Sequence, residues 1–334
     1  MADLRFAIVG TGMGSDRARK AANTPGARLA AICTLDEERG RKLAGELECD
    51  LVADYDALLA RDDVDVVGVL TPSGCHCDFA IRAMKAGKHA FTTKPMDIRV
   101  AKCDEAIRVA REAGRLLAVD FDCRYLPINH QVRQAIRSGK LGRVFMADLR
   151  MKWYREQSYY DGGTPAGWRS RLETEGGSAA NQAVHYIDLL QWWLGPINTV
   201  QGRIGTFAHA IETEDNTNAL VAFAGGAWGI IQTSTSNYPD LGTTIEISGD
   251  NGTLISRANE VALFKTRDDD APSLDAYPVD PNLPTNIIED MVAAIATGRK
   301  PMCPPEEGRQ SVAAFCAIYE SARTGKMVEL WGAA

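Results

Sequence analysis

A short apolar run that ends in closely spaced glycines constrains this chain more than any other feature of its sequence. The run Leu4–Val9 predicts a buried strand, and Gly10-Thr11-Gly12-Met13-Gly14 follows it directly, ahead of a helical stretch over residues 15–23. In such a unit the first glycine permits a tight turn, and the second lets the backbone approach a pyrophosphate at the helix N-terminus. The loop therefore predicts that Gly10, Gly12, Met13 and Gly14 bind a dinucleotide.

The end of the second predicted strand bears on which dinucleotide binds. NAD-binding domains usually place an acidic residue there to bind the ribose 2′-hydroxyl, whereas the strand over residues 29–33 is followed by Thr34. A threonine hydroxyl can bind either a ribose hydroxyl or a phosphate, and Arg39 of the next helix is a candidate to reach a 2′-phosphate. The sequence leaves NAD and NADP open, with a slight preference for NADP.

Apolar strands alternate with helical stretches up to about residue 120. Further strands are predicted over residues 64–70, 88–92 and 116–120, with helices over 36–47, 79–85 and 98–113. Such βαβ crossovers predict a parallel sheet that is covered by helices on both faces. We therefore expect an α/β protein in which residues 1–120 form a Rossmann-type, doubly wound dinucleotide-binding domain.

The pattern changes after residue 120. Helices are predicted over residues 127–138, 181–194, 286–297 and 306–324, a strand over 143–154, a loop over 156–177, and successive strands from 199 to 264. Asn251-Gly252 predicts a hairpin turn, because this dipeptide tolerates the positive φ angles that the turn needs. Residues 121–334 are therefore expected to form an α+β domain with a large, mainly antiparallel open sheet.

Composition limits the classes of function. The chain has 37 Lys and Arg against 44 Asp and Glu, a formal net charge of −7, which argues against nucleic acid as the main partner. No apolar run approaches the roughly 18 to 20 residues that span a bilayer, and the N-terminus lacks the parts of a signal peptide. The 8 cysteines show no disulfide or zinc spacing. We expect a cytoplasmic protein with no membrane partner and no metal site.

Lys94-Pro95 follows another predicted parallel strand. Ligands of parallel sheets bind at the carboxyl ends of the strands, so a lysine here can meet both the nicotinamide ribose and the substrate. Its ammonium group can orient a reacting hydroxyl and stabilise developing alkoxide charge. By position alone, an exposed lysine without a function is the more common outcome.

The segment from Glu175 to Asp188 carries the densest set of polar groups. In a regular α-helix, Asn181, His185 and Asp188 lie along one face, at spacings of i, i+4 and i+7. Histidine exchanges a proton near neutral pH, as the oxidation of a hydroxyl requires. The alternative is a core histidine on a helix that packs against the sheet.

Aromatic and basic side chains alternate upstream of this segment. They are Lys152, Tyr154, Arg155, Tyr160, Trp168 and Arg169. Aromatic faces suit sugar rings, and guanidinium groups suit carboxylates or phosphates. These residues are candidates for substrate binding, and a surface loop without a function is the alternative.

Taken together and in order, these pieces resemble the glucose-fructose oxidoreductase/inositol dehydrogenase (Gfo/Idh/MocA) family. The matching pieces are the glycine loop, Thr71-Pro72 with His76, Lys94-Pro95, Arg124-Tyr125 and residues 176–188. The resemblance implies a Rossmann domain followed by an α/β domain whose open sheet often forms a homodimer or homotetramer. It implies that Thr71, Pro72, His76, Lys94 and Pro95 bind the cofactor and that Arg124 binds substrate.

The resemblance also implies an activity. The family oxidises or reduces a hydroxyl of a sugar, cyclitol or nucleotide-sugar with NAD or NADP, and the resemblance makes Lys94 and His185 catalytic. The run Tyr159-Tyr160-Asp161, Trp168-Arg169 and Asn181-Gln182-Ala183 with His185 resembles the branch of UDP-sugar 3-dehydrogenases, which handle acidic sugars. We therefore expect hydride transfer between a nicotinamide and a secondary hydroxyl of such a substrate.

Two positions depart from the family pattern. Thr93 replaces a glutamate before Lys-Pro, and Asn181 replaces an acid four residues before the histidine. An amide cannot take a proton, so Asn181 can only orient the substrate or the imidazole. We expect His185 to take the hydroxyl proton and Lys94 to position the oxygen.

Two other classes of function stay open. One is a glycosidase or lyase that holds NAD tightly and oxidises its substrate transiently. The other is a ligand-sensing regulator that keeps this fold without catalysis. Retention of both Lys94 and His185 argues against the regulator.

Overall fold

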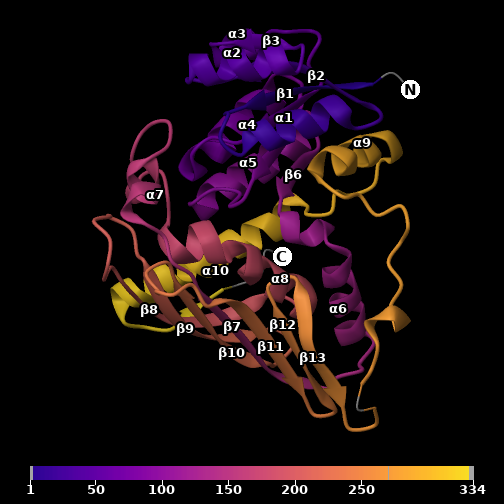
Figure 1. Cartoon of the computed structure of the whole chain (residues 1–334), viewed down its shortest axis with the longest axis vertical. Coiled ribbons are helices and arrows are strands. Elements are labelled where there is room, and N and C mark those ends of the chain that lie inside the picture. The colour runs from indigo at the N-terminus through magenta and orange to yellow at the C-terminus, as the bar shows by residue number, and fades with distance from the viewer. Residues whose placement is uncertain (1–2, 270, 331–334) are drawn as a thin grey trace. The chain divides into compact units, whose positions relative to one another are not determined.

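A six-stranded parallel sheet forms the centre of the first of two units in this computed structural model, which describes residues 3–269 and 271–330 (Figure 1). Its strands are β1 (Leu4–Val9), β2 (Ala27–Cys33), β3 (Asp50–Val52), β4 (Val66–Val69), β5 (His89–Thr93) and β6 (Leu117–Asp120). The order β3-β2-β1-β4-β5-β6 reverses direction between β1 and β4, the point beside which such sheets bind ligands. The expected Rossmann sheet is confirmed.

Helices alternate with these strands, as the sequence predicts. They are α1 (Gly14–Asn23), α2 (Glu37–Glu46), α3 (Tyr55–Leu59), α4 (His76–Lys85) and α5 (Val100–Ala113), and α9 (Ile287–Thr297) joins them from late in the chain. The sequence did not predict β3 or α3, which have 3 and 5 residues and therefore too little periodic pattern to detect.

The strands of this sheet are continuous apolar runs because helices cover both of its faces. Phe6, Ile8 and Phe91 are fully buried in it. Gly68 of β4 is required by the same packing, since an added Cβ would stand 2.3 Å from the ring of Phe91. The ring of Phe91, on β5, therefore packs closely over Gly68 of β4 in the centre of the unit.

The second unit is built on an eight-stranded sheet. Its strands are β7 (Val144–Lys152), β8 (Ile197–Gly205), β9 (Asn216–Phe223), β10 (Trp228–Ser234), β11 (Gly242–Gly249), β12 (Gly252–Arg257), β13 (Glu260–Thr266) and β14 (Val328–Glu329), in the order β13-β12-β11-β7-β10-β9-β8-β14. Only β7 and β10 pair in parallel. The expected, mainly antiparallel open sheet is confirmed, and so is the hairpin at Asn251-Gly252, which joins β11 to β12. Neither residue has the positive φ angle on which that prediction rested.

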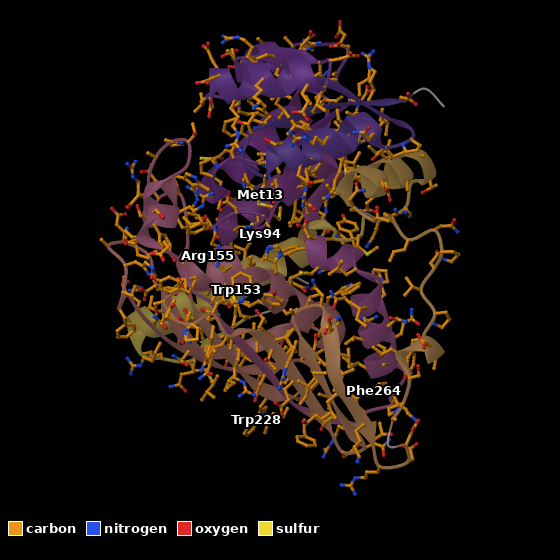
Figure 2. All side chains as sticks on the ribbon, viewed as in Figure 1. Met13, Lys94, Trp153, Arg155, Trp228 and Phe264 are labelled. Carbon is orange, nitrogen blue, oxygen red and sulfur yellow. The ribbon has the colours of Figure 1, made fainter. Side chains whose placement is uncertain are left out.

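Helix α8 (Val184–Leu194) and the part of α10 (Pro305–Thr324) from Gln310 onward pack on one face of this sheet, and α6 (Pro127–Arg137) packs against α8. The short helix α7 (Gln157–Asp161) lies in the segment expected as loop. Gly202 of β8 lets Ile318 of α10 pack closely, because an added Cβ would stand 2.9 Å from that side chain. The other face exposes Leu220 and Trp228, which are 60% and 73% accessible, and Figure 2 shows Trp228 at this outer face.

The helix expected from residue 181 begins differently from the prediction. Residues Ser178–Ala183 form a π-helix, and the regular α-helix α8 starts at Val184. A π-turn bonds residue i to i+5, which changes the angular spacing of its side chains. The expected alignment of three residues on one α-helical face is therefore wrong for Asn181, and it holds only for His185 and Asp188.

The two units are not continuous in sequence. Of the described residues, the first unit takes those up to 122 together with 162–169 and 284–309, and the second takes 123–161, 170–283 and 310 onward. The domain boundary expected after residue 120 stays a prediction. Among the helices of the described residues, none combines the length and the apolar character that crossing a membrane requires.

Candidate functional site

The glycine loop lies at the carboxyl end of β1, against the end of β4. Gly10 has φ +97°, and an added Cβ would stand 2.4 Å from the carbonyl oxygen of Leu70, so only glycine fits there. An added Cβ at Gly12 would meet no atom within 4 Å, which leaves its backbone open beside the N-terminus of α1. An open glycine backbone at a helix N-terminus fits a pyrophosphate. The residues of this loop therefore fit the dinucleotide that the sequence predicts.

Thr34 connects the end of β2 to this loop. Its hydroxyl lies 3.0 Å from the hydroxyl of Thr11, and its oxygen accepts the N–H of Asp36 at 3.2 Å. The Asp36 carboxylate in turn accepts the N–H of Arg39 at 3.0 Å and caps α2, while the Arg39 side chain is exposed. Thr34 thus lies where a ribose is expected, and an acidic residue follows it after two positions.

His76 joins two loops at the carboxyl edge of the sheet. Its ring is buried, with Nε2 2.8 Å from the carbonyl oxygen of Thr71 and Nδ1 2.7 Å from that of Pro95. Burial lowers the pKa of His76, against the effect of these two carbonyls. Both ring nitrogens thus lie at hydrogen-bond distance from backbone carbonyls, one in the Thr71-Pro72 segment and one at Pro95. The expectation that His76 binds the cofactor stays a prediction.

Lys94 follows β5 directly and is half-buried. The Lys94–Pro95 peptide is cis. The buried carboxylate of Asp97 accepts the N–H groups of Ile98 at 2.8 Å and Arg99 at 3.0 Å, which fixes the chain after the lysine. Figure 2 shows Lys94 and Met13 of the glycine loop at the same edge of the first unit. The structure thus brings the predicted lysine to the edge that carries the dinucleotide loop.

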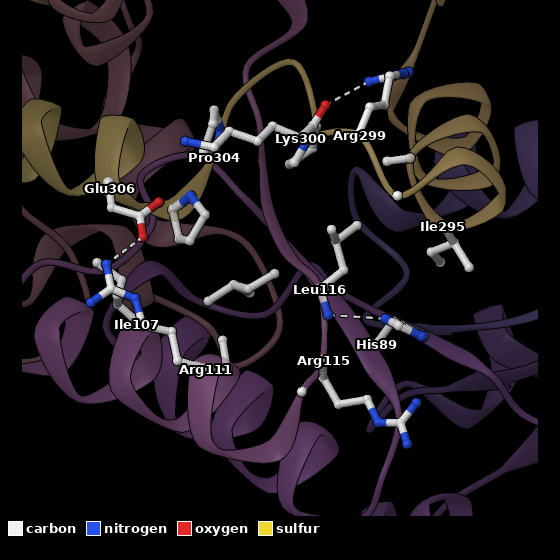
Figure 3. Close-up of a pocket in the computed structure, with 17 residues that line it drawn as sticks. His89, Ile107, Arg111, Arg115, Leu116, Ile295, Arg299, Lys300, Pro304 and Glu306 are labelled. Atoms are coloured by element: carbon white, nitrogen blue, oxygen red, sulfur yellow. Dashed lines mark hydrogen bonds and ion pairs between the residues drawn. The ribbon is translucent and has the colours of Figure 1, made fainter.

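A separate pocket opens at the opposite edge of this sheet, where β5 and β6 begin (Figure 3). It has a volume of about 580 Å³, and it is lined by His89 and by the charged residues Arg111, Arg115, Arg299, Lys300 and Glu306. Arg111 pairs with Glu306 at 2.8 Å. None of the predicted site residues lines this pocket, so we do not place the dinucleotide there.

Arg124 and Asp188 form an ion pair in the second unit. Nε of Arg124 lies 2.7 Å from Oδ2 of Asp188, and Nη2 lies 2.8 Å from Oδ1. The two side chains are 2% and 1% exposed, and Ser311 donates to Asp188 at 3.1 Å. The guanidinium group of Arg124 is thus buried and paired with a carboxylate of the same unit. The expectation that Arg124 binds substrate stays a prediction.

Asn181 is held at both ends of its amide. Its Nδ2 donates to the buried carboxylate of Glu175, and its Oδ1 accepts the hydroxyl of Tyr159 at 3.0 Å and Nε2 of Gln182. Arg155 extends this set, since its Nη2 donates to Gln182 at 3.3 Å. We call Glu175, Asn181, Gln182, Tyr159 and Arg155 the Asn181 cluster. The cluster fixes the orientation of the amide that replaces the family's acid.

Glu214 anchors the π-helix from which Asn181 projects. Its buried carboxylate accepts the N–H of Ala179 at 2.7 Å, the hydroxyl of Ser178 at 2.5 Å and the hydroxyl of Tyr319 at 3.1 Å. Burial raises the pKa of Glu214 to about 7, against the effect of these donors. Sequence reasoning missed this residue, whose only signal is an acidic run, Glu212 to Asp215, within a region of strands.

The remaining basic and aromatic candidates differ in exposure. Arg155 is half-buried and stacks over Trp153, 4.9 Å from the ring centroid. Both residues, which Figure 2 labels, follow the end of β7. Lys152 and Tyr154 lie beside it and are also half-buried. The ring of Tyr160 is buried, and its hydroxyl lies 2.6 Å from that of Thr235. The expectation that Tyr160 binds substrate stays a prediction.

Trp168 and Arg169 contact each other in the segment that groups with the first unit. The guanidinium carbon of Arg169 lies 4.3 Å from the ring centroid of Trp168. His185 lies in the first turn of α8, in the second unit, and is partly exposed, with its ring 6.5 Å from that of Tyr186. Within residues 3–269 and 271–330, no group of three His, Cys, Asp or Glu side chains is arranged to hold a metal ion.

A Rossmann unit with an open glycine cradle and a lysine at its carboxyl edge defines a dinucleotide-binding class of protein, and comparisons with known proteins identify the family. Residues 4–121 match the family described as "Oxidoreductase family, NAD-binding Rossmann fold", and residues 129–255 match the "GFO/IDH/MocA C-terminal domain". The chain belongs to the GFO/IDH/MocA family of NAD-binding oxidoreductases. The resemblance drawn from the sequence is confirmed.

The chain is similar to proteins of known activity. The structure of the WlbA dehydrogenase from Bordetella pertussis in complex with NADH and UDP-GlcNAcA is 30% identical, with a TM-score of 0.90, over 98% of this chain and 99% of that one. Inositol 2-dehydrogenase of Rhizobium meliloti is 26% identical over 75% of this chain and 74% of its own length. The 2,7-anhydro-N-acetylneuraminate hydratase of Mediterraneibacter gnavus is 28% identical over 65% of this chain, which spans only 57% of the hydratase.

Proposed function

We propose that this protein is a dehydrogenase that transfers a hydride between NAD and a secondary hydroxyl of a sugar, cyclitol or nucleotide-sugar. The observation that carries the proposal is the position of Lys94 at the carboxyl edge of β5, on the edge that carries the open backbone of Gly12. A bound nicotinamide supplies the hydride acceptor or donor. A lysine at that edge meets the reacting part of a substrate, because ligands of such sheets bind there.

The chain's own residues supply the proton chemistry. We assign to His185 the transfer of the hydroxyl proton, since an imidazole titrates near neutral pH. We assign to Lys94 the orientation of the reacting oxygen and the stabilisation of its developing negative charge. Asn181 cannot take a proton, and its amide is already bound to Glu175, so its assigned role is orientation alone.

For the substrate we propose an acidic sugar or UDP-sugar. The WlbA dehydrogenase, whose structure contains UDP-GlcNAcA, supports this class. Arg155, Lys152 and Arg169 are the candidate partners for its carboxylate or phosphates, because guanidinium and ammonium groups bind these anions. Tyr154 and Trp168 are the candidate surfaces for its rings.

For the cofactor we propose NAD, which the family description and the NADH complex of WlbA support. The slight preference for NADP that Thr34 suggests stays a prediction. Asp36, which lies two residues after Thr34 and caps α2, disfavours a 2′-phosphate in its vicinity. Rates measured with NAD and with NADP at equal concentration test both statements.

We also propose a homodimer or homotetramer that forms through the outer face of the eight-stranded sheet. Met146, Leu220, Trp228 and Leu263 are exposed on this face. Exposed apolar residues that gather on one face commonly mark an interaction surface. The cytoplasmic location expected from the sequence stays a prediction.

A substrate panel tests the proposal. Sugars, cyclitols, uronic acids and UDP-sugars, UDP-GlcNAcA included, are assayed with NAD and NADP by the absorbance of the reduced nicotinamide. We expect turnover with at least one acidic sugar or UDP-sugar. Binding of NAD without oxidation of any member of the panel would contradict the proposal.

A second candidate is a hydratase or lyase that oxidises its substrate transiently, and similarity to the anhydro-neuraminate hydratase favours it. Such an enzyme keeps its cofactor from one turnover to the next. NAD that co-purifies with the protein and is not consumed during turnover would support this candidate over the dehydrogenase.

A further inference from the structure

We propose that His76 is a positioning residue, which sets the place of Lys94 by donating its Nδ1–H to the carbonyl oxygen of Pro95. This inference rests on the proposed function, because it takes Lys94 to be catalytic. It concerns a residue that the family resemblance associates with the cofactor but whose ring nitrogens face only backbone carbonyls.

The ring of His76 lies between two segments that the proposed function uses. Nδ1 is 2.7 Å from the oxygen of Pro95, the residue after Lys94, and Nε2 is 2.8 Å from the oxygen of Thr71, which follows β4. The side chain is 1% exposed, so water does not compete for either contact. A neutral imidazole donates from one nitrogen only, and the proton of His76 is assigned to Nδ1, so the bond to Pro95 couples the position of the ring to the chain at Lys94.

The first turn of α4 holds the following residues in the same way. The thiol of Cys77 contacts the carbonyl oxygen of Met96 at 3.4 Å, and the N–H of Cys77 donates to Asp97 at 3.3 Å. Residues 95–97 are therefore bound one after another to His76 and Cys77. The His76 contact is the one nearest to Lys94, so its loss releases the lysine while the contacts of Cys77 keep the segment attached.

Two conservative substitutions of His76 distinguish the roles of its two ring nitrogens. The amide nitrogen of His76→Asn lies near the place of Nδ1 and retains a donor for Pro95. The amide nitrogen of His76→Gln lies near the place of Nε2, so it can donate to Thr71 but loses the bond to Pro95. If His76 had only a structural role, the two variants should lose similar amounts of activity. The positioning role predicts a larger loss of kcat in His76→Gln than in His76→Asn.

We expect His76→Gln to lower kcat by about 10- to 100-fold, since a displacement of about 1 Å at a reacting group can cost this much. His76→Asn keeps kcat within about threefold of the wild type, and both variants bind NAD with nearly unchanged Kd in calorimetric titration. Hydrogen exchange of residues 93–99 in the protein without cofactor is faster in His76→Gln than in His76→Asn. His89→Gln, at the other end of β5, is the control and leaves kcat and Kd unchanged.

Equal losses of kcat in the two variants, or no loss in either, would overturn the inference. Nitrogen NMR of the histidines in the wild-type protein gives a test that does not depend on the folding of a variant: we expect a proton on Nδ1 of His76, and a proton on Nε2 alone would overturn the inference. Lys94→Met separates the two proposals. Turnover in Lys94→Met contradicts the proposed function, whereas loss of turnover there without a difference between the His76 variants contradicts only the role of His76.

Discussion

Arg124 and Asp188 make two charge-assisted hydrogen bonds to each other in the interior of the second unit, at 2.7 and 2.8 Å. Asp188 lies three residues after His185 on α8, so the pair holds the helix that carries the proposed proton acceptor. The guanidinium group also lies 5.3 Å from the ring centroid of Trp192 on the same helix. The pair therefore acts on the position of His185 through α8.

Replacement of Asp188 by Asn should destabilise the protein strongly. It leaves the buried guanidinium group of Arg124 without its counter-charge, which typically costs about 3–5 kcal/mol. Unfolding in urea, followed by tryptophan fluorescence, measures the loss. The control is Glu46→Gln, which breaks the exposed pair with Arg19 in the first unit and should cost less than about 1 kcal/mol. Similar losses in the two variants would contradict the importance of the buried pair.

Glu214 should make the stability of the protein depend on pH. Burial raises its folded-state pKa to about 7, above its ordinary value of 4.5, so the folded protein holds a proton that the unfolded chain releases. The contribution of this group is therefore complete below about pH 4.5 and is lost as the pH rises through about 7. Glu214→Gln removes the titration and keeps an acceptor for Ala179.

The difference in the free energy of unfolding between Glu214→Gln and the wild type should therefore change with pH. Relative to the wild type, Glu214→Gln should gain on the order of 3 kcal/mol in free energy of unfolding between about pH 4.5 and about pH 8. Urea titrations at several pH values measure it, and the comparison with the wild type cancels the other titrating groups. A difference that does not change with pH would rule out the raised pKa.

Replacement of Asn181 by Asp restores the family's acid but places two carboxyl groups in contact, because Asn181 donates to Glu175. Two such groups cannot both ionise without cost, so the pKa of one of them rises. The variant should then lose about 1–3 kcal/mol of stability relative to the wild type as the pH rises above about 4. The double variant Asn181→Asp with Glu175→Gln should recover most of the loss, and a lack of recovery would contradict the pairing.

The outer face of the eight-stranded sheet gives a prediction about assembly. Trp228→Glu places a charge on this face and should shift the protein toward the monomer in sedimentation velocity experiments, because a buried, unpaired charge is costly. Phe207→Glu, at an exposed side chain that follows β8, is the control and should leave the assembly unchanged. A wild-type protein that is monomeric at micromolar concentration would refute the proposed oligomer.

The parallel sheet could be predicted because its information is local. Each strand is a short apolar run, and the conformation of Gly10 depends on the residue itself. The π-helix could not be predicted, because Glu214, which binds its first turn, lies 35 residues from Ala179 in the chain. A pattern of apolar positions carries no signal for such contacts.

For the candidate site, too, only the features that depend on local sequence could be predicted. Lys94 was found from its place after a strand, which is local information. The partners of Arg124 and His76 could not be predicted, because each is distant in the sequence: Asp188 lies 64 residues from Arg124, and Pro95 lies 19 residues from His76. Residue type and spacing cannot distinguish a polar group that binds a ligand from one that binds its own chain.

The most direct test of the account is hydride transfer by the wild-type protein and by His185→Ala, with NAD and the best substrate of the panel. We predict that the variant loses about 10²- to 10⁴-fold in kcat, the usual contribution of a general base, and binds NAD with the Kd of the wild type. Turnover in His185→Ala at the wild-type rate would contradict the central claim that this residue carries the proton in a dehydrogenase reaction.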